Sequence, residues 1–508
     1  MVKRLLLFLM LSSGAFTFAN AQGSDKDFIN QTGLELLDQW DAEAYRNVAN
    51  LLTQIMDYDT KEITQWGVQS LKAMKSVITE PYNGISDGYK LMARASSFTG
   101  HFKALSNRWV KEGDADDLQF AFNDKNGTYC LFRLYTSGTK KVITFTIDED
   151  EDDEWGDDDE WDDDDDEGLF SSPTIKEIMD GVKLISIEVP EHIDISFTQG
   201  KKQLMHTTID FDMSLFTNNW EPLSDGFMVS VKSSFAKSSG TGTFDMGMEN
   251  VGYKPGTGIN FSFYVKNAGK SLVTFGINAP GTLNLDDGAI NFDLDTGLTL
   301  NDIGIESLSL NLDVMGRIQA KGNIPDLVAF FNTLNSEGES EAEMKQIANK
   351  LNGLMNGNFY YNNGSTPKGY LAFQPYYDDD DEEWTVQPAI HFNSDNSTYP
   401  LETYFAEDNF PELYEGFGDI FSEMMELAST FIEKVQTMNE EASGATGIQS
   451  QPSVLTSGTR AEIYTSTGRL CGHTVIGANG QAVIPFTELP AGVYIVKTPS
   501  GSRKFIKK

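Results

Sequence analysis

The chain has 508 residues, a formal net charge of −38 and two cysteines. A surface of that sign repels nucleic acid and anionic lipid headgroups, which proteins bind through Lys and Arg, so we expect neither as a partner. With only Cys130 and Cys471, a disulfide framework is excluded, and stability has to come from buried apolar surface or bound ions.

Residues 1–21 have the pattern of a cleavable secretory signal peptide. Lys3 and Arg4 precede an apolar run that ends in Ala19-Asn20-Ala21, the small-residue site at which such signals are cut. A membrane anchor needs about 20 unbroken apolar residues, and neither this run nor a later one reaches that length. The sequence therefore predicts export through the Sec translocon and a mature chain that does not span a membrane.

Residues 22–96 predict a helical cap. Apolar side chains recur at steps of three and four from Leu34 to Ile55 and again from Ile63 to Ile78, and Pro81 ends the pattern, as expected of amphipathic helices.

Residues 97–439 predict a β-rich body. Alternation of period two, clearest in Ile290–Leu294 and Leu308–Val314, indicates strands with one wet face. Short turns such as Asp286-Asp287-Gly288 favour hairpins and hence a long antiparallel sheet, which we expect to be curved. Amphipathic stretches at about 325–355 and 411–438 predict helices on its apolar face. The expected fold class is α+β.

Two acidic loops interrupt this body, at residues 148–167 and 378–383. In the first, 17 of 20 residues are Asp or Glu. Carboxylates are the ligands that Ca²⁺ prefers, but a tight site needs a defined loop, and Thr174 stands where such a loop needs a Glu. The sequence therefore predicts no cofactor beyond weak, diffuse Ca²⁺ binding. The candidate ligands are Asp163, Asp165, Glu167, Asp379 and Asp381. The interpretation that we favour for the tracts is a disordered, self-repelling loop that keeps the surface soluble, with diffuse cation binding or docking to a basic partner as the alternatives.

Residues 440–460 are rich in Ser, Gly and Thr and predict a flexible linker. Residues 461–508 follow as a separate unit, in which short alternating strands predict a small β-sandwich. Its motifs are Ile463-Tyr464, Thr467-Gly468-Arg469-Leu470, Leu489 to Lys497, and the basic end Lys504-Phe505-Ile506-Lys507-Lys508.

These motifs resemble the type A sorting domain of the type IX secretion system. The resemblance implies recognition by the outer-membrane secretion machinery after passage through the periplasm, with delivery to the cell surface or the medium. The residues that carry it are Gly492, Tyr494, Val496, Lys497, Lys504, Lys507 and Lys508.

The body resembles exported β-rich proteins of the Bacteroidota that have no assigned activity. The resemblance rests on Gly127-Thr128-Tyr129-Cys130, on the acidic tract with Trp155 and Trp161, and on Pro190 to Gly200. It implies no functional residues.

No catalytic constellation is evident. Gly84-Ile85-Ser86-Asp87-Gly88 matches a hydrolase motif as a string, but that motif needs a strand before the Ser and a helix after it. The five histidines have no zinc-binding spacing, and no phosphate-binding glycine loop occurs. We therefore expect no catalytic residues, and this expectation disfavours an enzyme.

Three functions remain open on the sequence. The first is a non-enzymatic exported or surface protein that binds a cation, a glycan or a host partner. The second is a carrier of an apolar ligand between the sheet and its Met-rich helices, which requires an enclosed apolar pocket. The third is a secreted hydrolase, which requires two carboxylates or a Ser–His pair converging in one cleft.

Overall fold

The computed structural model describes residues 24–147, 178–217, 220, 225–282, 304–378, 383–420 and 422 of the body, and 460–465, 470–475, 492–498 and 501–507 near the C-terminus. The chain divides into two compact units, residues 1–148 with 180–438, and residues 149–179 with 439–508. Within the described residues, no helix combines the length and the apolar character needed to cross a membrane.

Three helices open the larger unit: α2 (Ser24–Gln39), α3 (Ala42–Ile55) and α4 (Lys61–Met74). The predicted helical cap is thus confirmed to Met74. Its last part is corrected, because strands β1 (Lys75–Val77) and β2 (Tyr89–Ala93) follow. Between these two strands, Asn83 and Gly84 both have positive φ, which a helix does not tolerate. The hydrolase-like Gly84–Gly88 string therefore lies in a turn before a strand.

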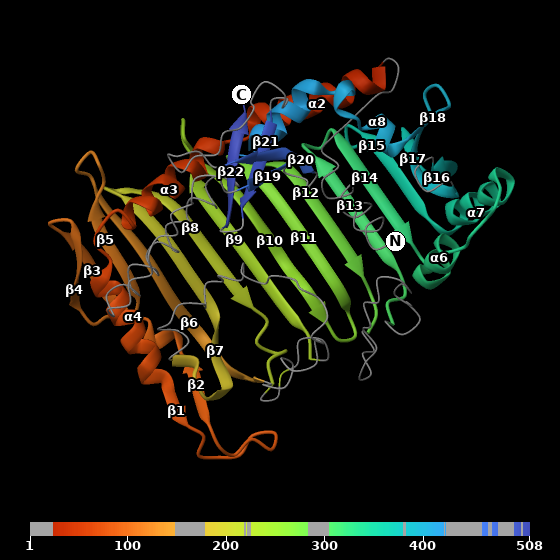
Figure 1. Cartoon of the computed structure of the whole chain (residues 1–508). Coiled ribbons are helices and arrows are strands. Elements are labelled where there is room, and N and C mark those ends of the chain that lie inside the picture. The colour runs from red at the N-terminus through yellow and green to blue at the C-terminus, as the bar shows by residue number, and fades with distance from the viewer. Residues whose placement is uncertain are drawn as a thin grey trace. The chain divides into compact units, whose positions relative to one another are not determined.

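The body is one sheet of 18 strands, which lie side by side in Figure 1. After β1 and β2, its strands up to the helical insert are β3 (Gly100–Leu105), β4 (Arg108–Gly113), β5 (Leu118–Asn123), β6 (Tyr129–Thr146), β7 (Val182–Gln199), β8 (Lys202–Phe211), β9 (Phe227–Ala236), β10 (Thr243–Lys254), β11 (Gly258–Asn267), β12 (Lys270–Ala279), β13 (Leu308–Val314) and β14 (Ile318–Ile324). Those after it are β15 (Asn356–Tyr361), β16 (Gly369–Asp378), β17 (Glu383–Phe392) and β18 (Ser397–Pro400).

Every strand from β6 to β18 pairs antiparallel with the next along the chain. The expected α+β class is therefore confirmed, with one correction: β2 pairs parallel to β7, and β3 parallel to β5. The 18-residue β7 is longer than β8, which pairs with its second half only. The first half is left free for β2, which comes from the helical cap. The predicted strand at Ile290–Leu294 lies outside the described residues.

The helical inserts occur where the sequence predicts them. Residues 325–355 form two helices, α6 (Leu327–Leu334) and α7 (Glu341–Leu354). Asp326 caps the first by accepting a hydrogen bond from the Ala329 N–H at 2.9 Å. At the second, the Ser340 hydroxyl accepts from the Glu343 N–H at 3.4 Å, and the Glu343 carboxylate accepts from the Glu339 N–H at 2.9 Å. A short α8 (Leu401–Tyr404) precedes residues 411–420, which are helical. Most of the predicted remainder, to residue 438, is outside the described residues.

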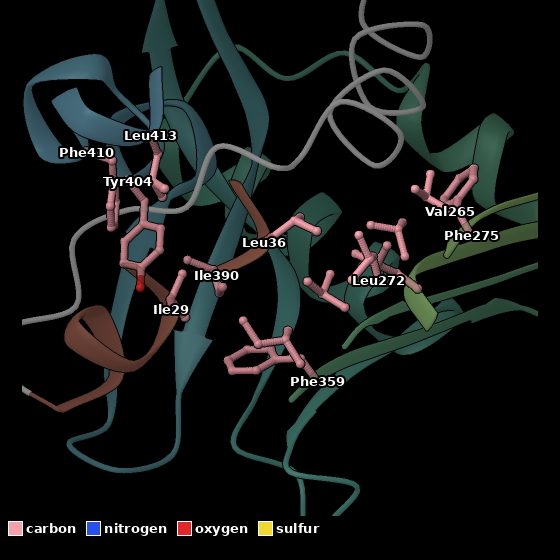
Figure 2. Close-up of a cluster of buried hydrophobic side chains, with 14 of the residues drawn as sticks. Ile29, Leu36, Val265, Leu272, Phe275, Phe359, Ile390, Tyr404, Phe410 and Leu413 are labelled. Atoms are coloured by element: carbon pink, nitrogen blue, oxygen red, sulfur yellow. The ribbon is translucent and has the colours of Figure 1, made fainter. Parts of the chain in front are cut away.

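The described helices pack on one face of the sheet, here called the apolar face. Figure 2 shows part of its main cluster, in which Ile29 of α2 lies beside Ile390 and Tyr404, and which continues past Leu36 to the buried strand residues Val265 and Phe275. Two further clusters extend it: α3 packs around Trp109 and Phe197, and α6 and α7 pack around Phe373. Burying each such side chain contributes about 1.5–3 kcal/mol, and this burial replaces the disulfides that the chain lacks.

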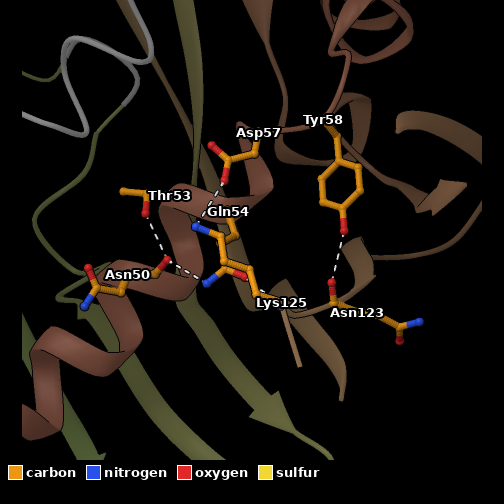
Figure 3. A network of polar contacts seen from close by, with 7 residues as sticks. All are labelled: Asn50, Thr53, Gln54, Asp57, Tyr58, Asn123 and Lys125. Carbon is orange, nitrogen blue, oxygen red and sulfur yellow. Dashed lines mark hydrogen bonds and ion pairs between the residues drawn. The ribbon is translucent and has the colours of Figure 1, made fainter. Parts of the chain in front are cut away.

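The end of α3 is fastened to the turn between β5 and β6 (Figure 3). The Lys125 N–H donates to Gln54 Oε1 at 3.3 Å, and the Tyr58 hydroxyl donates to the Asn123 carbonyl at 3.0 Å. The Lys125 ammonium lies 4.0 Å from Asp57. These contacts fix the helix along the strands that it covers.

The smaller unit contains β19 (Arg460–Thr465), β20 (Leu470–Val475), β21 (Gly492–Thr498) and β22 (Gly501–Lys507). They form one antiparallel sheet in the order β20-β19-β21-β22. Residues 476–491, which hold a further predicted strand, lie outside the described residues, so the β-sandwich stays a prediction.

Candidate functional site

The predicted metal ligands Asp163, Asp165, Glu167, Asp379 and Asp381 lie outside the described residues. Their positions in the topology are equivalent, since each acidic loop joins two antiparallel neighbours, β6 to β7 and β16 to β17. Among the residues that the structure describes, no group of three or more His, Cys, Asp or Glu side chains could hold a metal ion.

The predicted sorting residues fall on two neighbouring strands. Gly492, Tyr494, Val496 and Lys497 are on β21, and Lys504 and Lys507 are on β22. The strands pair antiparallel, with Gly492 opposite Lys507 and Ile495 opposite Lys504. The two halves of the motif thus share one hairpin, while Lys508 is outside the described residues.

The face of the sheet opposite the helices, here called the polar face, carries four of the five histidines. On β7 and β8, His192 Nδ1 lies 2.5 Å from Asp210, and His206 Nε2 lies 2.7 Å from Asp194. Ser196 is opposite His206 in the register. Ser196, His206 and Asp194 are thus neighbours in the order Ser–His–Asp that many hydrolases use. However, all four side chains of these pairs are about a third to a half exposed, and no serine is hydrogen-bonded to His206 in the described part of the chain. These are partly exposed pairs on the sheet surface.

Polar side chains are aligned across β11 to β18 in three rows, because directly opposed residues of neighbouring strands share a face. The first row is Asn260, Asn278, Ser309, Asn323 and Asn356; the second is Ser262, Gly276, Asn311, Lys321, Asn358, Tyr370, His391 and Thr398; the third is Tyr264, Thr274, Asp313, Gln319 and Tyr360. We call them the three polar rows. They were not predicted, since the sequence does not give the register.

The rows lead into a groove of about 490 Å³ beside α7. It exists because β15 begins at Asn356, whereas β16 continues to Asp378, so the far half of β16 has no neighbouring strand on that side. Asn352 of α7 takes its place. Its Nδ2 donates to the Phe373 carbonyl at 3.0 Å, and its Oδ1 accepts from the Phe373 N–H at 2.6 Å.

Amide side chains are the main polar groups that line the groove, beside apolar residues of α7 and β16. Asn349, Asn356, Asn358 and Gln374 reach it from α7, β15 and β16, and Lys345 is the one charged residue among those that line it. In the described residues these four amides make no side-chain hydrogen bond. Each amide offers two donors and an acceptor, so the groove presents unpaired groups of both kinds.

Tyr370 forms an aromatic wall of the groove. Its ring stacks on His391, with the centroids 4.5 Å apart and the planes at 29°. His391 is held in turn by a contact of 2.8 Å between its Nδ1 and the Thr398 hydroxyl. Tyr370 nevertheless remains 39% exposed, so the ring is fixed in place and open to a ligand.

The sequence does contain a signal for this groove. Asn349 and Asn352 are three residues apart on a helix, and Asn356 and Asn358 are two apart on the next strand, spacings that place each pair on one side of its element. The chain matches no known protein family, no curated protein and no solved structure at a significant level.

Proposed function

We propose that this is an exported, non-enzymatic binding protein whose groove holds a short stretch of a neutral glycan. The observation that carries the proposal is the pairing of unbonded amides with the fixed, exposed ring of Tyr370. Sugar hydroxyls both donate and accept hydrogen bonds, as amides do, and the apolar face of a sugar ring packs well on an aromatic ring. A few polar groups that orient a ligand against such a wall are typical of binding sites.

The net charge disfavours an anionic ligand. The chain carries a net charge of −38, and a field of that sign repels anionic polymers. The unpaired amides of the groove do not suit the apolar-carrier hypothesis, and the partly exposed His–Asp pairs, to which no described serine is bonded, do not suit the hydrolase hypothesis.

Export is the second part of the proposal. It rests on the signal pattern of residues 1–21 and on the resemblance of residues 461–508 to the type IX sorting domain, which make the Sec translocon and the type IX machinery the expected partners and the cell surface or the medium the destination. Deleting residues 461–508 should retain the protein inside the cell envelope. Unchanged surface delivery in cell fractionation would disprove the assignment.

Weak Ca²⁺ binding by the acidic loops is part of the same proposal. Sites without a defined loop bind Ca²⁺ with dissociation constants of about 10⁻⁴ to 10⁻³ M. Calorimetric titration should therefore show several weak sites, and a single submicromolar site would contradict it.

The glycan proposal is tested by isothermal titration calorimetry of the mature chain. The probes are soluble neutral oligosaccharides built on glucose, xylose, mannose and N-acetylglucosamine, with oligogalacturonate as the anionic comparison. At least one neutral series should bind, and Tyr370→Ala should weaken it about tenfold, which corresponds to about 1.4 kcal/mol. Tyr129→Ala is the matched control, because Tyr129 is 48% exposed and does not line the groove. Binding of no neutral series, or equal affinity of the wild type and Tyr370→Ala, would refute the proposal.

A further inference from the structure

We propose that the three polar rows extend the groove into a surface for a linear neutral polysaccharide, whose chain runs across the strands from β18 toward β11. This inference rests on the proposed function and specifies its ligand as a polymer. The groove and the rows are continuous, since Asn356 belongs to the first row, Asn358, Tyr370 and Thr398 belong to the second, and all four line the groove.

The geometry of the rows requires a long ligand. Neighbouring strands are about 4.8 Å apart, and successive residues on one face of a strand are about 7 Å apart. A ligand that contacts one row meets a side chain at each strand interval, so it must itself be extended. From β11 to β18 the second row crosses seven intervals, a length of about 34 Å at that spacing.

Three asparagines of the first and second rows are available for binding. Asn278, Asn311 and Asn323 are exposed, and in the described residues their amides hydrogen-bond to no other group. Asn311 lies over Gly276, where an added Cβ would come within 2.8 Å of its Nδ2. The glycine thus leaves room for the amide to lie along the sheet surface, where a flat chain would pass.

Charge and polarity identify the kind of polymer. Lys321 and Asp313 are the two residues with a full charge in the three rows, and they are of opposite sign. A nucleic acid needs several cations to neutralise its phosphates, and a protein partner needs an apolar centre in its interface. Rows of amides and hydroxyls supply neither, whereas they match a neutral chain of hydroxyl groups.

The test is the dependence of affinity on chain length, measured by calorimetry with two, four, six and eight sugar units of a neutral series that binds. Affinity should rise at least tenfold from the disaccharide to the octasaccharide. The double variant Asn311→Ser with Asn323→Ser should reduce octasaccharide affinity about tenfold and leave the disaccharide within twofold. Ser196→Ala with Ser234→Ala is the matched control on the same face, outside the rows, and should change neither. Unchanged circular dichroism and melting temperature verify that the variants are folded.

The outcomes separate the two proposals. If the disaccharide and the octasaccharide bind equally, or the double variant has no effect, the groove alone is the site and the extended surface is refuted while the proposed function stands. If no neutral sugar of any length binds, both are refuted. Tighter binding of oligogalacturonate than of every neutral series would refute the assignment of a neutral polymer.

Discussion

Replacing Asn352 with Ala should release α7 from the open edge of β16. The side chain of Asn352 makes two hydrogen bonds to the backbone of Phe373, at 3.0 and 2.6 Å, and Phe373 is only 8% exposed. Each buried backbone group left without a partner costs about 1–3 kcal/mol. Because the groove admits water beside them, part of that cost is recovered, and we expect a loss of about 2–3 kcal/mol.

Amide hydrogen exchange measures this effect at the site itself. A loss of about 1.4 kcal/mol is a factor of ten, so the Phe373 N–H should exchange at least about 30-fold faster in Asn352→Ala. The fold itself should persist, because Leu351 and Ala348 still pack on the sheet through the cluster around Phe330.

Asn349→Ala is the control for this experiment. Asn349 lies one turn earlier on α7, is exposed and makes no side-chain hydrogen bond within the described residues, so its replacement should change stability by less than about 0.5 kcal/mol. If both variants exchange at the same rate, the amide of Asn352 does not hold the helix to the strand. Apolar packing alone would then position the groove.

Three further changes test other parts of the structure. A Cβ at Gly33 in α2 would lie 2.8 Å from the fully buried side chain of Leu413, while one at Gly67 in α4 meets nothing within 4 Å. Gly33→Ala should therefore lower the free energy of unfolding by about 1–3 kcal/mol, and Gly67→Ala should raise it by about 0.5–1 kcal/mol. A change of the same sign in both variants would contradict this packing. Burial, followed by the charge of Asp124, raises the pKa of the Cys130 thiol to about 11, so a thiol reagent at pH 8 should label it only after denaturation. This pKa lies above the unfolded value of about 8.5, so the stability that the neutral thiol contributes is fully present below about pH 8.5 and declines as the pH rises toward 11. A difference in unfolding free energy between wild type and Cys130→Ser that does not change with pH would contradict this. Replacing residues 148–167 with a short Gly/Ser linker should leave the fold intact, and a melting temperature lower by many degrees would show that the loop is structural.

The sequence predicts the elements of this fold better than their arrangement. The period of three to four residues finds α3 and α7, and the period of two finds strands such as β13, because each reports which side of an element is apolar. Pairing between distant strands leaves no such local trace. The parallel contact of β2 with β7 joins residues about 90 positions apart, and it depends on β7 being longer than β8, which hydrophobic periodicity does not measure.

The candidate site was harder to predict for a related reason. Its groove arises from a difference in length between β15 and β16, and its rows arise from the register of eight strands. The asparagines of residues 349–358 have the right local spacing, but a one-residue shift in register would turn an entire strand over. The acidic loops, by contrast, are conspicuous in the sequence, and the structure describes neither beyond the strand ends that flank it.

The distribution of charge links the acidic loops to the polar face. A wide sheet face that no described helix covers usually carries charged side chains, yet the three polar rows contain only Lys321 and Asp313 as fully charged residues. Seventeen carboxylates are instead gathered in residues 148–167, in a loop between strands that already pair along their length. Exposed charges are screened within about 8 Å at physiological salt, so carboxylates in this loop give the protein a large part of its net charge without competing for the hydrogen-bonding groups of the rows. Under the proposed function, the neutral rows bind an uncharged polymer, while the negative net charge of the rest of the protein repels other copies of the same protein.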